Sequence, residues 1–189
     1  MEGSPDWDAL FELAQGQQGY FTTSQAASVG YSSQLLYKYL RNGTVTRVRR
    51  GVYRLVHFPA DQEEDLVPLW LWSERVGVFS HETALALQDL SDALPSRVHM
   101  TLPAAWRHRR LKVPEGLVLH FADLDESELR HAAVVPFTAP KRTIADCMAV
   151  HFAPDLVYQA VVQARQRGLI SGVEEVELLA ALPGMAQGP

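Results

Sequence analysis

The spacing of hydrophobic positions predicts that the chain begins with short helices. In residues 6–16 apolar side chains recur at the spacing of one helix face, which predicts a helix. The side chains expected on its buried face are Trp7, Leu10, Phe11 and Ala14. Thr22 and Gln25 then stand at capping-box spacing, so a second short helix is expected to begin there and to end at Gly30.

A third predicted helix, residues 33–42, carries two contrasting faces. Ser32 and Ser33 precede it as residue types that cap helix N-termini. Its expected buried stripe consists of Leu35, Leu36, Tyr39 and Leu40. Its opposite face consists of Ser33, Gln34, Tyr37, Lys38 and Arg41. A helix of this kind that directly follows a helix of only two turns is typical of a helix-turn-helix.

Two alternating stretches, residues 44–48 and 52–55, flank Arg49-Arg50-Gly51 and predict a β-hairpin. We therefore expect residues 1–58 to form a winged helix-turn-helix domain, with residues 33–42 as the reading helix and the hairpin as the wing.

Composition changes after Pro59, where acidic residues accumulate, and we place a domain boundary there. Residues 59–189 mix helix and strand patterns without regular alternation, which predicts an α+β domain and an α+β class for the whole chain. Helices are expected at residues 66–76, at 81–87 with Ser80 as cap, and at 142–151, 155–168 and 171–182. Strands are expected at residues 97–102, 117–121 and 133–137.

Charge is distributed very unevenly along this pattern. Between Tyr20 and His57 the chain has six basic residues and no acidic one, although its net charge is -5. A basic module on an acidic protein indicates a polyanionic partner, and double-stranded DNA fits the predicted fold. The residues expected to contact DNA are Ser32, Ser33, Gln34, Tyr37, Lys38 and Arg41 on the helix and Arg47, Arg49 and Arg50 on the wing.

A second basic cluster lies between two predicted strands. It consists of Arg107, Arg109, Arg110 and Lys112, with His108 among them. It is a candidate for a second nucleic-acid contact or for docking an acidic partner, although a charged surface loop is the favoured interpretation.

The sequence predicts no catalytic or metal site and no cofactor. Seven histidines are scattered without HxxxH spacing, and no CxxC, Walker loop or GxSxG motif occurs. Arg142 and Asp146 are expected to form an i,i+4 ion pair, and Cys147 to be a buried thiol. His81-Glu82 is interpreted as a capping pair, with ion binding as the alternative.

The bulk features favour a cytoplasmic protein without a membrane span. A single cysteine excludes an internal disulfide framework and suits a reducing compartment. No apolar run approaches the roughly 20 residues of a membrane helix, and residues 1–8 lack the pattern of a secretory signal.

Three stretches, taken in order, resemble the AbiEi-type antitoxins of bacterial type IV toxin–antitoxin systems. They are GYFTTSQAASVGYSSQLLYKYLRNGTVTRVRRGVYRL, FSHETALALQDLSDALPSRVHMTLP and VVPFTAPKRTIADCM. The resemblance implies a winged helix that binds inverted repeats in its own promoter as an autorepressor. It also implies a C-terminal domain that antagonises a nucleotidyltransferase-like toxin, without a stable complex and without catalysis of its own.

Two alternatives remain open at this stage. One is a ligand-responsive winged-helix transcription factor without a toxin partner, whose C-terminal domain should hold a pocket with converging polar groups. The other is a reduced nuclease-related protein, because similar stretches also precede nuclease-like domains of the very-short-patch-repair type. Neither the operator, nor the toxin target, nor the oligomeric state follows from the sequence.

Overall fold

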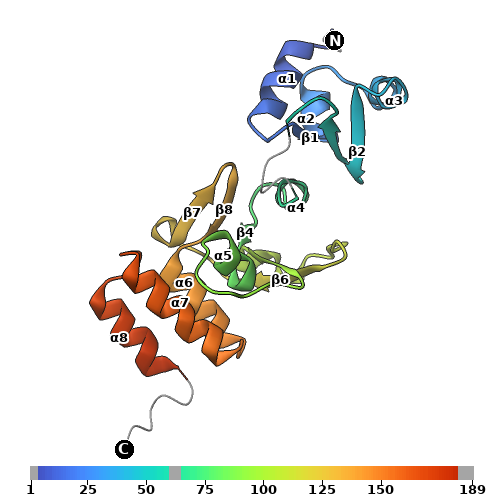
Figure 1. Cartoon of the computed structure of the whole chain (residues 1–189). Helices are drawn as coiled ribbons and strands as arrows, with labels where there is room; N and C mark the ends of the chain where they lie inside the picture. The colour runs from blue at the N-terminus through green and yellow to red at the C-terminus, as the bar shows by residue number, and fades with distance from the viewer. Residues whose placement is uncertain (1–3, 60–64, 183–189) are drawn as a thin grey trace, which may run out of the picture. The chain divides into compact units, whose positions relative to one another are not determined.

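The N-terminal part of the chain is a winged helix-turn-helix (Figure 1). Its elements are α1 (Trp7–Gln15), β1 (Tyr20–Thr22), α2 (Thr23–Ser28), α3 (Ser33–Arg41), β2 (Val45–Arg49) and β3 (Val52–Leu55). The strands form a sheet in the order β1-β3-β2, and β3 pairs antiparallel with both neighbours. The predicted helices and hairpin are thereby confirmed. Strand β1 was not predicted, because three residues are too few to show an alternating pattern.

Capping side chains fix where the two helices of the motif begin. Thr22 Oγ1 accepts a hydrogen bond from the Gln25 amide at 3.1 Å, and Gln25 Oε1 accepts one from the Thr22 amide at 2.8 Å. This is the predicted capping box. Ser32 Oγ accepts from the Leu35 amide at 3.2 Å and so caps α3. Gly30 has a φ of 88°, a left-handed conformation that costs glycine little and permits the tight turn between α2 and α3.

The core of this part is apolar and partly aromatic. Its buried members are Leu10, Ala14, Phe21, Ala26, Tyr31, Leu36, Val45 and Leu55. Phe11 does not join them, since 41% of it is exposed, so its expected place on the buried face of α1 was wrong. The α1 helix turns Leu10 and Ala14 fully inward, and Phe11, one position further round, lies outside that face.

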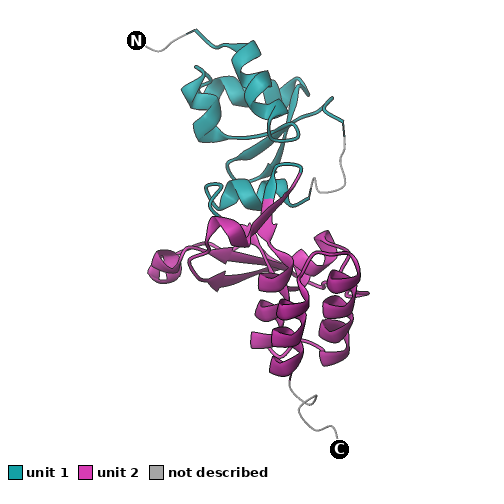
Figure 2. Cartoon of the chain, turned by 90° about the vertical axis from the view of Figure 1, so that its left-hand side faces the viewer, with its two compact units in different colours: residues 1–76, 133–135 teal, residues 77–132, 136–189 magenta. Residues whose placement is uncertain are grey.

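The structure describes residues 4–59 and 65–182, and the chain divides into two compact units, shown in separate colours in Figure 2. Unit 1 comprises Met1–Val76 and Ala133–Val135, and unit 2 comprises Gly77–Ala132 and Pro136–Pro189. Helix α4 (Val67–Trp72) contacts β1 and β3, which explains why it belongs to unit 1. It is shorter than the helix expected over residues 66–76, because the chain leaves the helix at Ser73 and then takes positive φ at Glu74 and Arg75.

Unit 2 combines a mixed sheet with helices, which confirms the α+β class. The five-stranded sheet has the order β6-β5-β4-β8-β7, with β4 antiparallel to β5 but parallel to β8, and β5 parallel to β6. The strands are β4 (Val78–Phe79), β5 (Val98–Leu102), β6 (Leu117–Phe121), β7 (Leu129–Ala132) and β8 (Val135–Thr138). The helices are α5 (His81–Leu87), α6 (Pro140–Ala149), α7 (Pro154–Gln166) and α8 (Gly172–Ala181), with 3-10 turns η1 (Ala104–His108) and η2 (Glu126–Glu128).

Helices α5 to α8 enclose the main apolar core of unit 2. Ile144, Val161 and Leu178 bring one buried side chain each from the last three helices, and Leu85 adds one from α5. Ser171 and Glu174 form the predicted capping box of α8. Among the described residues, no helix combines the length and the apolar character that crossing a membrane requires.

The predicted Ser80 cap on α5 was wrong. Ser80 occupies the N-cap position, but its side chain makes no capping hydrogen bond. Its Oγ instead accepts from Thr101 Oγ1 at 2.8 Å and lies 2.9 Å from Nδ1 of His81. The hydroxyl is therefore drawn toward the neighbouring strand rather than toward the helix amides.

Candidate nucleic-acid interface

An aromatic cluster holds α3 in place within unit 1. The ring of Tyr39 stacks on Trp7 with centroids 5.7 Å apart and meets Tyr31 edge-on at 5.6 Å. Leu36, from the same side of α3, is 1% exposed in the core. Offset and edge-on aromatic contacts of this kind add orientation to burial. The helix therefore has one defined inner face, and the opposite face is fixed toward solvent.

The residues predicted to read DNA all lie on that outer side. Ser32, Ser33, Gln34, Tyr37, Lys38 and Arg41 are exposed. Tyr37 is 62% exposed, so its ring is accessible for contact with base edges or sugars. Ser32 uses its Oγ to cap the helix, so its contribution to an interface is restricted to its hydroxyl proton and backbone. Short residues here let a phosphate approach the free amides of the helix start.

The wing lies next to this helix, because α3 and β2 are in contact. The pairing of β2 with β3 shifts between Arg47 and Arg49, so Val48 forms a bulge and is 41% exposed. Gly51 at φ 79° closes the turn, and its carbonyl accepts a hydrogen bond from the Thr23 amide at 2.9 Å. The wing tip is thereby tied to the start of α2 through backbone atoms, which leaves its side chains available.

Helix α3 and the wing together carry five cationic side chains that have no carboxylate partner among the described residues. They are Lys38, Arg41, Arg47, Arg49 and Arg50, and within residues 4–59 and 65–182 none of them takes part in an ion pair. Arg47 Nε donates to the Arg49 carbonyl at 3.4 Å, a long bond that orders the wing. Unneutralised cations on adjacent elements give a positive surface that phosphates can neutralise.

Arg54, the sixth basic residue of the segment, has a structural position instead. Its guanidinium lies 5.4 Å from the centroid of the Tyr20 ring and donates to the carbonyls of Phe58 and Pro59 at 3.1 and 3.2 Å. These contacts tie the end of the hairpin to the strand β1. Charge counting along the sequence does not distinguish this arginine from those of the wing.

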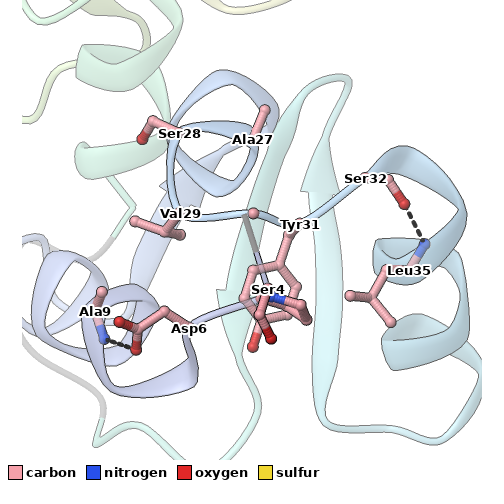
Figure 3. Close-up of a pocket in the computed structure, with 11 residues that line it drawn as sticks. Ser4, Asp6, Ala9, Ala27, Ser28, Val29, Tyr31, Ser32 and Leu35 are labelled. Atoms are coloured by element: carbon pink, nitrogen blue, oxygen red, sulfur yellow. Dashed lines mark hydrogen bonds between the residues drawn. The ribbon is translucent and has the colours of Figure 1, made fainter. Parts of the chain in front are cut away.

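A hollow of about 910 Å³ lies at the turn between α2 and α3 (Figure 3). Asp6 and Ser32 line it, but Asp6 Oδ1 accepts from the Ala9 amide at 3.0 Å and Ser32 Oγ caps α3. Tyr31 also lines it, and burial, the hydrogen bond to Tyr39 and the nearby carboxylates raise its pKa to about 12. Its phenol therefore stays neutral. The Asp6 carboxylate would repel a phosphate, and the polar side chains of Asp6 and Ser32 are already hydrogen-bonded to backbone amides. The hollow is therefore unsuited to phosphate.

The second basic cluster lies in unit 2, on and after η1. Arg107 donates to the Phe121 carbonyl at 3.1 Å, and the guanidinium of Arg109 lies 3.8 Å from the centroid of the Trp106 ring. Arg110 and Lys112 are exposed. Two of the four cations are thus held against the domain.

Arg142 and Asp146 of unit 2 belong to a network of ion pairs. Arg142 bonds Asp146 at 2.8 Å, as predicted, and also Glu128 at 3.0 Å. Burial raises the pKa of the Asp146 carboxyl in spite of this partner, whereas the backbone amide of Asp125 and the guanidinium lower that of Glu128. Cys147 is buried as expected, and burial raises the pKa of its thiol, which disfavours the reactive thiolate.

Histidines that are scattered in the sequence are partly gathered in the structure. One candidate ligand atom from each of His81, His99 and His120 lies within 4.8 Å of the others. No sequence spacing indicates this cluster, because its members come from α5, β5 and β6, whereas an HxxxH pattern finds only ligands on one helix. His81 points into this cluster and does not form the capping pair expected of His81-Glu82.

The comparisons with known proteins agree with the winged helix. Residues 8–56 match a family described as "Transcriptional regulator, AbiEi antitoxin", which confirms the resemblance over this segment. The crystal structure of the RV2827C protein from Mycobacterium tuberculosis is similar to this chain, with a TM-score of 0.52 and 17% sequence identity. The similarity covers 98% of this chain and 75% of that one, and at this identity it shows the fold alone. No curated protein matches the chain.

Proposed function

We propose that this protein is the antitoxin of a type IV toxin–antitoxin system and that it represses its own promoter. In this proposal residues 1–58 bind double-stranded DNA, and residues 59–189 antagonise a nucleotidyltransferase-like toxin without catalysis of their own. Residues 8–56 match a family described as "Transcriptional regulator, AbiEi antitoxin", which supports a regulator of the antitoxin class. The role given to residues 59–189 extends this description beyond the matched segment.

One observation carries the DNA-binding half. Lys38 and Arg41 on α3, with the arginines of the wing, present cations that have no carboxylate partner among the described residues, on a scaffold held by buried aromatic contacts and backbone bonds. Helix α3 would enter the major groove with its N-terminal turn toward base edges, while the wing would contact the sugar–phosphate backbone. Inverted repeats would then present one half-site to each winged helix.

The alternative of a ligand-responsive regulator receives less support from unit 2. A hollow of about 350 Å³ is lined there by Lys141 and Arg142 among others. Lys141 is already paired with Glu177 at 2.8 Å, and Arg142 is paired with Glu128 and Asp146. Two of its three cationic groups are thus neutralised within the protein, and the third, Arg130, donates to the backbone carbonyls of Ser127 and Leu129. A ligand pocket instead needs polar groups that converge on the ligand.

The direct test is a binding titration of the whole protein on DNA from upstream of its own gene, with scrambled DNA as competitor, at two salt concentrations. We expect specific, salt-sensitive binding that is abolished by Lys38→Ala with Arg41→Ala. The matched control is Lys141→Ala with Arg165→Ala, which removes the same two charges from side chains paired with glutamates in unit 2. Unchanged affinity in a folded Lys38/Arg41 variant would remove α3 as the reading helix.

The antitoxin half has its own test. The proposal predicts a neighbouring gene for a nucleotidyltransferase-like toxin. Expression of that gene should arrest growth, and co-expression of this protein should restore it. The variant with Lys38→Ala and Arg41→Ala should still restore growth, since its residues 59–189 are unaltered. Rescue that disappears together with DNA binding would show that the protein acts only by repressing transcription.

A further inference from the structure

Three histidines from different elements meet on one face of the unit 2 sheet. His81 is the first residue of α5, His99 lies in β5 and His120 in β6. The two strands are parallel, with His99 opposite Val118 and Thr101 opposite His120. Because side chains two apart on a strand share a face, His99 and His120 stand diagonally on the same side of the sheet. Their ring centroids are 5.2 Å apart, and His81 stacks on His120 at 3.5 Å.

The ring nitrogens already stand at distances that suit a shared metal ion. Nδ1 of His99 lies 3.1 Å from Nε2 of His120. Zinc binds imidazole nitrogen at about 2.0–2.1 Å in tetrahedral geometry, which separates two nitrogen ligands by about 3.3 Å. The measured separation is therefore close to that of two ligands on one ion. In the absence of metal the same distance is bridged by a single proton.

Oxygen atoms of neighbouring side chains lie beside the outward nitrogens of two of the rings. Nε2 of His99 faces Glu82 Oε1 at 3.8 Å, and Nδ1 of His81 lies 2.9 Å from Ser80 Oγ. When the outward nitrogen of a ligating histidine is held by a carboxylate or another oxygen, the inward nitrogen keeps its lone pair for the metal. In the tautomers in which Nε2 of His99 and Nδ1 of His81 carry the proton, His99 offers Nδ1 and His81 offers Nε2 to a metal.

The rings are also in the protonation state that metals require. Burial lowers the pKa of His81 to about 3 and that of His120 to about 4, and it also lowers the pKa of His99. Neutral imidazole is the form that binds a metal ion, so no proton has to be displaced from a charged ring near neutral pH.

We propose that His81, His99 and His120 form a binding site for a divalent transition metal of the zinc type, with Glu82 as the carboxylate that orients His99. A three-histidine set leaves one tetrahedral position for water, as in open zinc sites. The parallel stacking of His81 on His120 requires these two rings to tilt about their Cβ–Cγ bonds when the ion enters. His81 has a φ of 54°, an uncommon conformation for a non-glycine residue, and it is the most buried of the three histidines.

The test uses the full chain with any affinity tag removed, stripped with a chelator and titrated with Co²⁺ and then Zn²⁺. We expect one ion per chain, with the intense visible bands of four-coordinate cobalt that zinc displaces. His99→Gln and His120→Gln should each weaken binding at least tenfold. The matched control His131→Gln, at an exposed histidine of the same unit, should bind as the unaltered protein does.

Two further measurements keep the result independent of folding defects. Glu82→Gln retains all three rings and should weaken zinc about 10- to 100-fold, as loss of an orienting partner does. The unaltered protein should also melt at a higher temperature in excess zinc, and this shift should vanish in His99→Gln. Absence of the cobalt bands in the unaltered protein, or equal binding by the His99, His120 and His131 variants, would overturn the proposal.

Discussion

Arg50 and Arg54 lie four residues apart in the same hairpin, and the structure assigns them opposite roles. Arg50 is exposed at the wing turn, whereas Arg54 donates to two backbone carbonyls and lies over the Tyr20 ring. We predict that Arg50→Ala weakens DNA binding without loss of stability. Arg54→Ala should lower stability and leave the salt dependence of DNA binding unchanged.

The magnitudes follow from the number of cations that meet phosphates. Five cations predict a slope of log K against log salt of about -4.5, and each lost contact reduces its magnitude by about 0.9. Raising salt fourfold should then weaken the unaltered protein about 500-fold and the Arg50→Ala variant about 150-fold. Arg54→Ala should lower the free energy of unfolding by on the order of 1–3 kcal/mol, because it removes charge-assisted hydrogen bonds. Arg50→Ala should change it by less than about 0.5 kcal/mol.

Fluorescence anisotropy of labelled upstream DNA over a salt series, together with urea unfolding, measures both quantities on the same samples. Comparison at equal folded concentration removes the effect of lower stability in the Arg54 variant. A slope reduced equally in both variants would refute the division of roles, since it would show that the hydrogen-bonded guanidinium also neutralises a phosphate. An unchanged slope for Arg50→Ala would show that the wing does not touch the DNA backbone.

Three further predictions concern stability. Leu36→Ala should cost about 2–5 kcal/mol in urea unfolding, because the side chain is 1% exposed in the core that carries α3, and a smaller cost would mean that the core refills. Acidification from pH 7 to 5 should lower stability by on the order of 1–2 kcal/mol after allowance for solvent screening, because the lowered pKa values of His81 and His120 keep both rings neutral in the fold while the unfolded chain takes up protons. If a variant with both His81→Gln and His120→Gln lost stability with pH in the same way as the unaltered protein, this explanation would be contradicted. Arg142→Ala should cost on the order of 3 kcal/mol by leaving the Asp146 carboxylate unpaired, and adding Asp146→Asn should recover part of that loss.

The winged helix was predictable because its signals are local. Thr22 with Gln25 and Ser32 before α3 mark helix starts within one turn, and the alternation around Gly51 marks a hairpin. The short strands β1 and β4 were not predictable, because two or three residues carry too little alternation. Their strand conformation comes from pairing with partners distant in sequence.

The candidate sites differ in the same way, according to whether their signals are local in the sequence or depend on the fold. The exposed face of α3 follows from its helical period, so its polar residues could be named from the sequence alone. The role of Arg54 could not, because it depends on carbonyls of Phe58 and Pro59 that the fold brings back over Tyr20. The histidine cluster is the extreme case, since its geometry depends on the register of two strands and on where α5 begins.

In unit 1 the proposed DNA contacts and the contacts that hold the scaffold are made mostly by different atoms. The position of α3 depends on the buried rings of Tyr31 and Tyr39, and the position of the wing depends on the bond from the Thr23 amide to the Gly51 carbonyl. Two outward-facing side chains also contribute to the scaffold, because Ser32 Oγ caps α3 and Arg47 Nε donates to the Arg49 carbonyl. If the exposed side chains of α3 contact bases as proposed, substitutions there at positions other than Ser32 should alter the DNA sequence that is bound at little cost to folding, because burial and backbone bonds hold the scaffold.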